Sequence, residues 1–190
     1  MIGDKKRCGW CVGKPLYEKY HDEEWGLPVY DDKIQFEFLV LESAQAGLSW
    51  WTILQRREGY RKAFANFDYK KVAKFSQARI EELILDASII RNRAKIEATV
   101  NNAQRFMEVQ KEFGSFSNYI WSFVDGKPID TKAKTLKDVA ATSAESDALA
   151  KDMKKRGFKF LGSTTLYAHM QATGLVNDHV ADCFRYKECK

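Results

Sequence analysis

Residues 79–105 read RIEELILDASIIRNRAKIEATVNNAQR, and this stretch decides the fold. Apolar side chains recur three or four positions apart over 80–84 and again over 96–107, which is the spacing of one helical face. Ser76 supplies an N-cap for the first helix, and Gly114 ends the second. Because only the short break at residues 86–91 separates the two patterns, the stretch predicts two helices joined by a hairpin.

The same helical spacing is found upstream of the hairpin. Asp32 is expected to cap a helix, with Gln35 completing a capping box. Ile34 and Phe38 then share a face with Glu42, which points the Glu42 carboxylate into an apolar region. A buried carboxylate is retained when something satisfies it. A salt bridge to a Lys or Arg and a contact with a ligand are therefore both open interpretations.

Helical patterns also fill most of the remaining chain, and most of them follow serine caps. We find no convincing alternating strand pattern and no internal repeat, so the predicted fold class is all-α. The least helical stretch, residues 125–142, is interpreted as a long connection between two lobes. The other predicted helices run from Ser49 through Phe64, from Ser115 through Phe123, up to Gly157, and from Ser163 to Gly174.

Composition limits the class of protein. The chain has 190 residues, of which 45% are hydrophobic and 13% aromatic, enough to bury the core of one domain. No apolar run reaches the roughly 18 residues that span a bilayer, and residues 1–6 lack the apolar stretch of a secretory signal. We therefore expect a cytoplasmic protein without membrane association, whose four cysteines are free or metal-bound. The formal net charge of +5 permits nucleic-acid binding without requiring it.

Two pairs of metal-ligand residues lie near opposite ends of the chain. Cys8 and His21 form one pair, and His179 and Cys183 form the other. Zinc takes thiolate and imidazole ligands in a tetrahedron, and four protein ligands leave no open position, so such a site would be structural. It would clip distant segments together. The alternatives are a CxxC pair at Cys8 and Cys11, or cysteines that act only as small hydrophobes.

Aromatic rings crowd the N-terminal segment. Trp10, Tyr17, Tyr20 and Trp25 lie within sixteen residues, and Trp50 follows later. Rings in this pattern are most often core residues. Planar rings close together can also sandwich a nucleobase, with each stacking contact worth about 1 to 3 kcal/mol. A cationic base would gain more from the ring faces.

Basic residues mark two candidate DNA contacts. The hairpin leads to a helix N-terminus whose amide groups, with Arg91, Arg93 and Lys95, could hold a DNA phosphate. A second basic run occupies residues 151–159 and ends at Lys159. Either feature could equally be an ordinary helical hairpin or a solvated helix face.

Seven short motifs then occur in a fixed order. They are RCGW at 7–10, YHDEEWG at 20–26, QAGLSW at 45–50, IIRNR at 89–93, WSF at 121–123, KRGFKF at 155–160 and GLVNDH at 174–179. In this set the chain resembles the 3-methyladenine DNA glycosylase I family of helix-hairpin-helix DNA glycosylases, over about residues 7–186. The resemblance implies two helical lobes around a base-binding cleft, with the N- and C-terminal segments joined by a structural zinc.

The resemblance also implies a single glycosylase domain over residues 1–190. A helical lobe with the hairpin would occupy about 31–125, and a zinc lobe would combine about 1–30 with 126–190. The implied zinc ligands are Cys8, His21, His179 and Cys183, without Cys11. The implied base pocket consists of Trp10, Tyr17, Tyr20, Trp25, Glu42 and Trp50. The expected DNA contacts are Gly47, Leu48, Arg91, Arg93, Lys95 and Lys159, with Leu48 entering the base stack.

The implied function is DNA repair by excision of 3-methyladenine from alkylated double-stranded DNA, which leaves an abasic site. Methylation at N3 makes the base cationic and a good leaving group, so Glu42 serves mainly to recognise and position it. The resemblance implies no catalytic Asp, and we interpret Asp125 as a loop residue. We expect a monomer without a protein partner. An alternative function is a zinc-clipped helical protein that binds damaged DNA without cutting it.

Two features depart from the family pattern. Ala87-Ser88 stands where such hairpins usually place glycine, which puts the shape of the phosphate site in doubt. The tail from Tyr186, which includes Cys189, matches no motif that we can interpret.

Overall fold

The computed structural model describes residues 5–189. Residues 1–4, part of the segment assessed above for a secretory signal, and Lys190 at the end of the tail lie outside the described residues. The described chain is mainly helical, which confirms the expected fold class. Its elements are α1 (Pro15–Glu23), α2 (Asp32–Gln45), α3 (Trp50–Leu54), α4 (Arg57–Ala63), η1 (Ala65–Phe67), α5 (Tyr69–Val72), α6 (Gln77–Leu85), α7 (Arg93–Phe113), α8 (Phe116–Trp121), η2 (Ser122–Val124), β1 (Ile129–Asp130), η3 (Leu136–Asp138), α9 (Ala144–Lys155), α10 (Ser163–Ala172) and β2 (Val176–Asn177).

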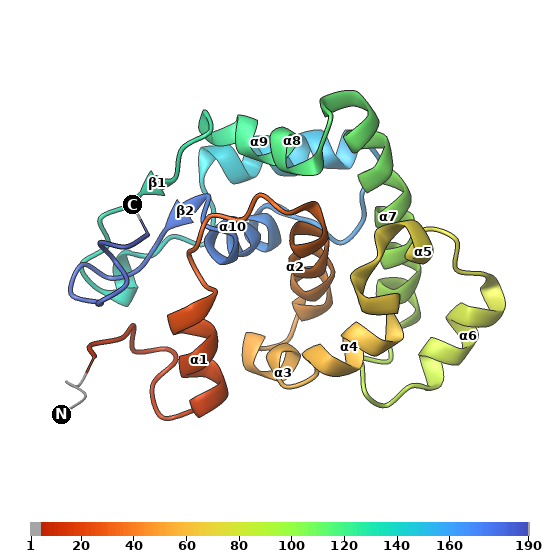
Figure 1. Ribbon diagram of the computed structural model, residues 1–190, viewed down its shortest axis with the longest axis horizontal. Helices are drawn as coiled ribbons and strands as arrows, with labels where there is room; N and C mark the ends of the chain where they lie inside the picture. Colours follow the sequence, from red (N-terminus) through yellow and green to blue (C-terminus); the bar gives the residue numbers. More distant parts are fainter. Residues whose placement is uncertain (1–4, 190) are drawn as a thin grey trace.

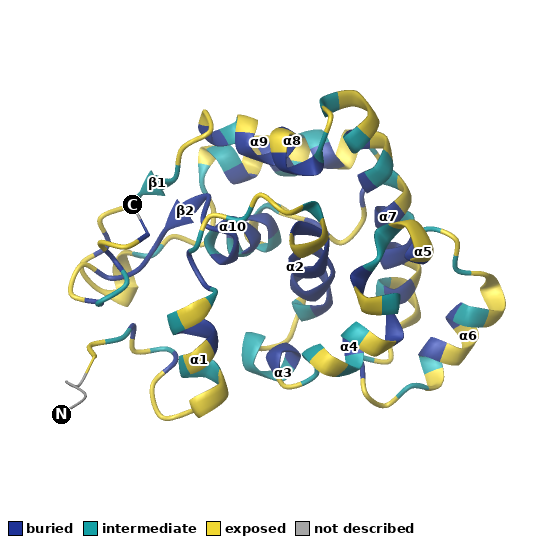
Figure 2. Cartoon of the chain, viewed as in Figure 1, coloured by how far each residue is buried: buried dark blue, intermediate teal, exposed yellow. Residues whose placement is uncertain are grey.

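Helix α2 is the centre of the molecule. Helices α7, α8 and α10 pack around it (Figure 1), and residues 35–44 are all buried (Figure 2). The larger hydrophobic cluster reaches from Phe36 to Val176 and so draws on most of the chain. Because α2 is enclosed on every side there, the polar side chains among residues 35–44 are buried as well. Burying a polar group without a partner costs free energy, so each of them needs a hydrogen-bond partner or a ligand.

The start of α2 differs from the sequence-based expectation. Its cap is Asp31, whose carboxylate accepts the backbone N–H groups of Lys33 and Ile34 at 2.8 and 3.0 Å. Asp32 is instead the first helical residue and accepts the backbone N–H of Ser117 at 2.8 Å, at the start of α8. Ile34 is 41% exposed rather than part of the core. The expected cap was wrong by one residue because α8 recruits the second aspartate.

Two other local expectations were wrong. The helix expected from Ser49 through Phe64 breaks at Arg56 into α3 and α4, although Ser49 does cap α3 by accepting the Thr52 N–H. The break allows Arg57 to pair with Glu37 on α2. A short parallel pair also joins β1 to β2, so the connection over 125–142 carries one two-residue strand. Neither strand is long enough to produce an alternating pattern in sequence.

Helices α6 and α7 pack against each other and are joined by residues 86–92, in the stretch where the sequence predicted two helices and a hairpin. Ser76 caps α6 through the Arg79 N–H, and Gly114 follows α7 with a φ of 83°. In the turn, Asp86 accepts the Ser88 N–H at 2.8 Å, and no residue from 86 to 92 has a positive φ. Ala87 and Ser88 therefore fit this turn without the glycine that a left-handed conformation would require.

The first and last described segments of the chain lie on the same side of the molecule, at the left of Figure 1. There the segment around Cys8 lies beside the segment around Cys183, and the Phe184 N–H donates to the carbonyl of Lys6 at 2.9 Å. A second, smaller hydrophobic cluster joins these segments to α1 and α2. Among residues 5–189, no helix is both long and apolar enough to span a membrane.

Candidate active site

A pocket of about 360 Å³ opens between α1, α2, α3 and α10. Its volume lies in the range of small-molecule sites, and its walls are rich in aromatic rings. All six residues expected to form the base pocket line it. The lining consists of Trp10, Tyr17, Tyr20, Trp25, Glu42, Gln45, Trp50, Leu136, Val139, Ala168, Gln171 and Asp178.

The aromatic residues form a continuous wall. The Trp10 ring lies 4.8 Å from the Tyr17 ring and 5.0 Å from the Trp25 ring, measured between centroids. The Tyr20 ring lies 5.4 Å from the Trp50 ring, also measured between centroids. Helix α1 supplies the two tyrosines at positions three residues apart, which share one helical face. These contacts give the pocket a preformed apolar lining.

Glu42 is the exceptional residue of this pocket. It is 4% exposed on α2. Two other buried polar side chains of that helix have partners: Gln35 bonds to His169 at 2.7 Å, and Glu37 pairs with Arg57. Within residues 5–189, no hydrogen bond or ion pair joins the Glu42 carboxylate to another residue. The carboxylate faces the pocket with its bonding capacity unused.

The environment of Glu42 makes its charge costly. Burial raises the pKa of this carboxyl to about 8, and no neighbouring cation lowers it. Burial, followed by the nearby Glu42, also raises the pKa of Tyr20 well above its ordinary value. An entering cation would pair with Glu42 inside an apolar cavity, where charges interact more strongly than in water.

The structure adds lining residues that sequence reasoning missed. Asp178 is a second buried carboxylate, but it accepts hydrogen bonds from Thr131 at 2.5 Å, Tyr167 at 2.8 Å and Gln171 at 2.7 Å. Other residues of the protein therefore satisfy most of the hydrogen-bonding capacity of Asp178, in contrast to that of Glu42. Asp178 belongs to the GLVNDH motif, but no feature of the sequence indicated that its side chain lines the pocket. Leu136 lies in the stretch interpreted above only as a connection.

The expected DNA-contact residues have unequal surroundings. Leu48 is 40% exposed beside Gly47, which has a φ of 79° that favours glycine. Arg91 and Lys159 are exposed, whereas Arg93 is paired with Glu81 at 2.6 Å. Lys95 is half-buried, and its ammonium donates to two carbonyls at the end of α2. Asp125, interpreted as a loop residue, is exposed after η2 and does not line the pocket.

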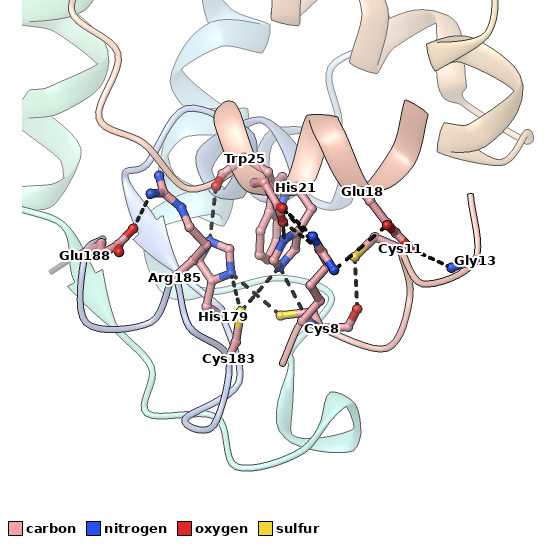
Figure 3. Close-up of polar contacts among 12 residues, drawn as sticks. Cys8, Cys11, Gly13, Glu18, His21, Trp25, His179, Cys183, Arg185 and Glu188 are labelled. Atoms are coloured by element: carbon pink, nitrogen blue, oxygen red, sulfur yellow. Dashed lines mark hydrogen bonds and ion pairs between the residues drawn. The ribbon is translucent and has the colours of Figure 1, made fainter. Parts of the chain in front are cut away.

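The four expected metal ligands come together at the junction of the chain ends (Figure 3). The ligand atoms of Cys8, His21, His179 and Cys183 all lie within 4.8 Å of one another, and all four residues are buried. Cys11 is outside this group, and its thiol donates to the carbonyl of Cys8 at 3.1 Å. Two thiols and two imidazoles converging in the interior form a set that could hold a metal ion.

Groups around the cluster orient both imidazoles. His21 Nδ1 lies 2.9 Å from an Asp22 carboxylate oxygen, and His179 Nε2 lies 3.1 Å from the carbonyl of Trp25. If these nitrogens donate, the lone pairs of His21 Nε2 and His179 Nδ1 face the cluster, and His21 Nε2 also accepts the backbone N–H of Cys8 at 3.5 Å. The hydrogen bond from the Cys8 thiol lowers the pKa of Cys183 and so favours its thiolate, the form that binds metals.

Comparisons with known proteins converge on one family. The model of the methyladenine glycosylase family matches residues 10–186. DNA-3-methyladenine glycosylase 1 of Escherichia coli strain K12 is 49% identical over 181 residues, covering 95% of this chain and 97% of the relative. A crystal structure of 3-methyladenine DNA glycosylase I has a TM-score of 0.92 at 47% identity, covering 94% of this chain and 98% of that chain. For the Staphylococcus aureus 3-methyladenine DNA glycosylase I, solved to explain 3-methyladenine recognition, the TM-score is 0.91 at 41% identity, covering 96% and 97%.

Proposed function

Because this chain belongs to the methyladenine glycosylase family, we propose that it excises 3-methyladenine from alkylated DNA by hydrolysing the bond between base and sugar. One observation carries the choice of substrate. The buried Glu42 carboxylate lines an aromatic pocket and has no partner among the described residues. A flat cationic base satisfies both features, because its faces stack on rings and its charge pairs with the carboxylate.

Recognition depends on the charge of the lesion. Methylation at N3 gives the adenine base a positive charge while it is still attached to the sugar. Glu42 accepts a hydrogen bond from the exocyclic amine of the base, and its ionised form is favoured once that cation is present. Neutral adenine offers no charge to offset the cost of a buried carboxylate. Discrimination therefore rests on the electrostatics of a single residue.

The chemical step requires little help from the protein. The bond between the sugar carbon and the base nitrogen breaks, and its electron pair leaves with the base, which becomes neutral 3-methyladenine. A water oxygen bonds to the sugar carbon and loses one proton to solvent, leaving an abasic site. Since the leaving group departs uncharged, no general acid has to protonate it. The chain's residues bind the base, orient it and exclude water from its faces.

DNA engagement involves the loop after α2 and the hairpin. The target nucleotide must leave the duplex before its base can enter the pocket, and an apolar residue can fill the gap in the stack. Leu48 has the exposure and the Gly47 turn that this role needs. Arg91 and Lys159 are exposed cations available to phosphates, and Arg93 could exchange its surface partner Glu81 for one.

We propose that the metal at the cluster is zinc and that its role is structural. Tetrahedral zinc with sulfur at about 2.3 Å and nitrogen at about 2.0 Å separates those ligand atoms by roughly 3.5 Å. Three of the four sulfur–nitrogen pairs here lie 3.4 to 3.6 Å apart. Cys8, His21, His179 and Cys183 would hold the ion and fill all four positions, so it would join the chain ends and take no part in excision.

Product identification tests the proposed function. The purified protein is incubated with methylated duplex DNA, and any released base is identified by chromatography and mass spectrometry. Release of 3-methyladenine that depends on Glu42 supports the proposal. Tight binding to the methylated duplex without release of a base would overturn it in favour of a protein that binds damage without cutting.

A further inference from the structure

Lys95 is bonded to the end of another helix. Its side chain rises from the first turn of α7, and Nζ donates to the carbonyl of Ala44 at 2.9 Å and to the carbonyl of Ala46 at 2.6 Å. These acceptors lie about fifty positions away in sequence. Burial lowers the pKa of Lys95, so the ammonium is partly withdrawn from water by this contact. The sequence had suggested a phosphate contact for this residue.

The two carbonyls lie in the last turn of α2 and at its C-cap, just before Leu48. Helix α2 ends at Gln45, and the Leu48 N–H closes a tight turn on the carbonyl of Gln45 at 2.6 Å. The last carbonyls of a helix have no partner within it, and a cation near them is favoured by the helix dipole. Lys95 fills two of these acceptors, one on each side of the carbonyl that Leu48 uses.

The other end of the Lys95 contact is equally well held. The Asn92 side chain accepts the backbone N–H of Lys95 at 3.1 Å, and the Lys95 carbonyl accepts the Thr99 hydroxyl at 2.9 Å. Residue 95 thus lies in the first turn of α7, three residues after Asn92, and the Asn92 side chain joins its backbone to the 86–92 turn. In Figure 1, α2 runs downward and α7 upward, so the C-terminal end of α2 and the N-terminal end of α7 lie in the same half of the molecule.

We propose that Lys95 is a positioning residue that ties the turn carrying Leu48 to the hairpin, so that docking of the 86–92 turn on the DNA backbone sets Leu48 in register with the duplex. The proposal rests on the proposed function in taking Leu48 as the residue that enters the stack. Two of the three ammonium donors are used within the protein. Lys95 therefore acts through the position of Leu48 and not through a phosphate.

A double-mutant cycle tests this coupling. Lys95→Met keeps the length of the side chain and removes every donor, whereas Lys95→Arg keeps donors for the same carbonyls. Lys95→Met, Lys95→Arg and Leu48→Gly are each made as single variants. The double variant combines Lys95→Met with Leu48→Gly. Lys111→Met, at an exposed position on the same helix, is the matched control. The readouts are single-turnover release of 3-methyladenine from duplex and single-stranded DNA, the salt dependence of duplex binding, and binding of free 3-methyladenine.

We expect Lys95→Met to slow release from duplex DNA about tenfold, as for loss of a charge-assisted hydrogen bond, with a smaller effect on single strands. Free 3-methyladenine should bind as in the parent, and Lys95→Arg should restore most of the duplex rate. In the Leu48→Gly background, Lys95→Met should add less than a twofold loss, because both changes act through one element. Lys111→Met should leave the duplex-to-single-strand ratio unchanged.

Several results would overturn the proposal. Losses that multiply in the double variant would mean that Lys95 acts independently of Leu48. A logarithmic salt slope lower by about one unit in Lys95→Met would identify a phosphate contact instead. Equal losses from Leu48→Gly on both DNA forms would remove the wedge role and this proposal with it. Failure of the parent to release the base would refute the proposed function itself. If Lys95→Met does not fold, Lys95→Gln, which retains one donor site, replaces it in the same cycle.

Discussion

Glu42→Gln should weaken excision and yet stabilise the protein at neutral and alkaline pH. The variant keeps the size of the side chain and an acceptor oxygen, but it removes the charge that favours a cationic base. Loss of a charge-assisted hydrogen bond costs about 1.5 to 3 kcal/mol, or roughly 10- to 150-fold in excision rate. Single-turnover release of 3-methyladenine measures this loss of excision rate.

The predicted gain in stability follows from the buried carboxyl of Glu42. Its pKa is about 8 in the folded protein against an ordinary value of 4.5. Between these values the folded state binds the proton more tightly than the unfolded chain does, so the free energy of unfolding falls as pH rises. The stability linked to Glu42 is fully present below pH 4.5 and is lost as pH rises through about 8. Glutamine cannot titrate and avoids this loss.

The measurement is the difference in unfolding free energy, variant minus parent, from urea denaturation at several pH values. Other titrating groups cancel in this difference, which should grow by up to about 4 kcal/mol from pH 5 to pH 8. Glu37→Gln is the matched control on α2, because Glu37 is buried but paired with Arg57 and Arg61. That variant should be less stable than the parent at pH 8. A difference for Glu42→Gln that does not change with pH would refute the reasoning, as would unchanged excision.

Three further predictions concern the cluster and the substrate range. Cys183→Ser should lose bound zinc, measured by atomic absorption, together with thermal stability, whereas Cys11→Ser should lose neither; equal zinc loss in both variants would reject the ligand assignment. Gly26→Ala should lower the free energy of unfolding by about 1 to 2 kcal/mol from its φ of 82° alone, and further because the new Cβ would lie 2.8 Å from His179 Nε2; an unfolding midpoint equal to that of the parent would contradict this. Hypoxanthine, which is neutral, should stay in DNA from which 3-methyladenine is removed; comparable release rates would mean that the site does not select for charge.

The sequence by itself determined the helical fold and many helix ends. Ser49, Ser76 and Ser115 each cap the helix expected after them, because a cap bonds to an amide only three residues away. The ordered motifs were equally informative, since they identified the family before any contact was known. The roles assigned to individual pocket, DNA-contact and metal-cluster residues, the division into two lobes, the monomeric state and the cytoplasmic location remain predictions.

Only the tertiary structure decided which polar groups are satisfied. Asp31 and Asp32 are equivalent as caps in sequence, and the choice between them came from α8, more than eighty positions away. Glu42 could have been paired, as Glu37 is on the same helix, and Lys95 could have faced solvent or DNA. Helical periodicity specifies the face on which a side chain lies, but the groups opposite that face depend on how distant helices pack. For this reason, the unpartnered carboxylate in the pocket and the lysine that holds the Leu48 turn could not be read from the sequence.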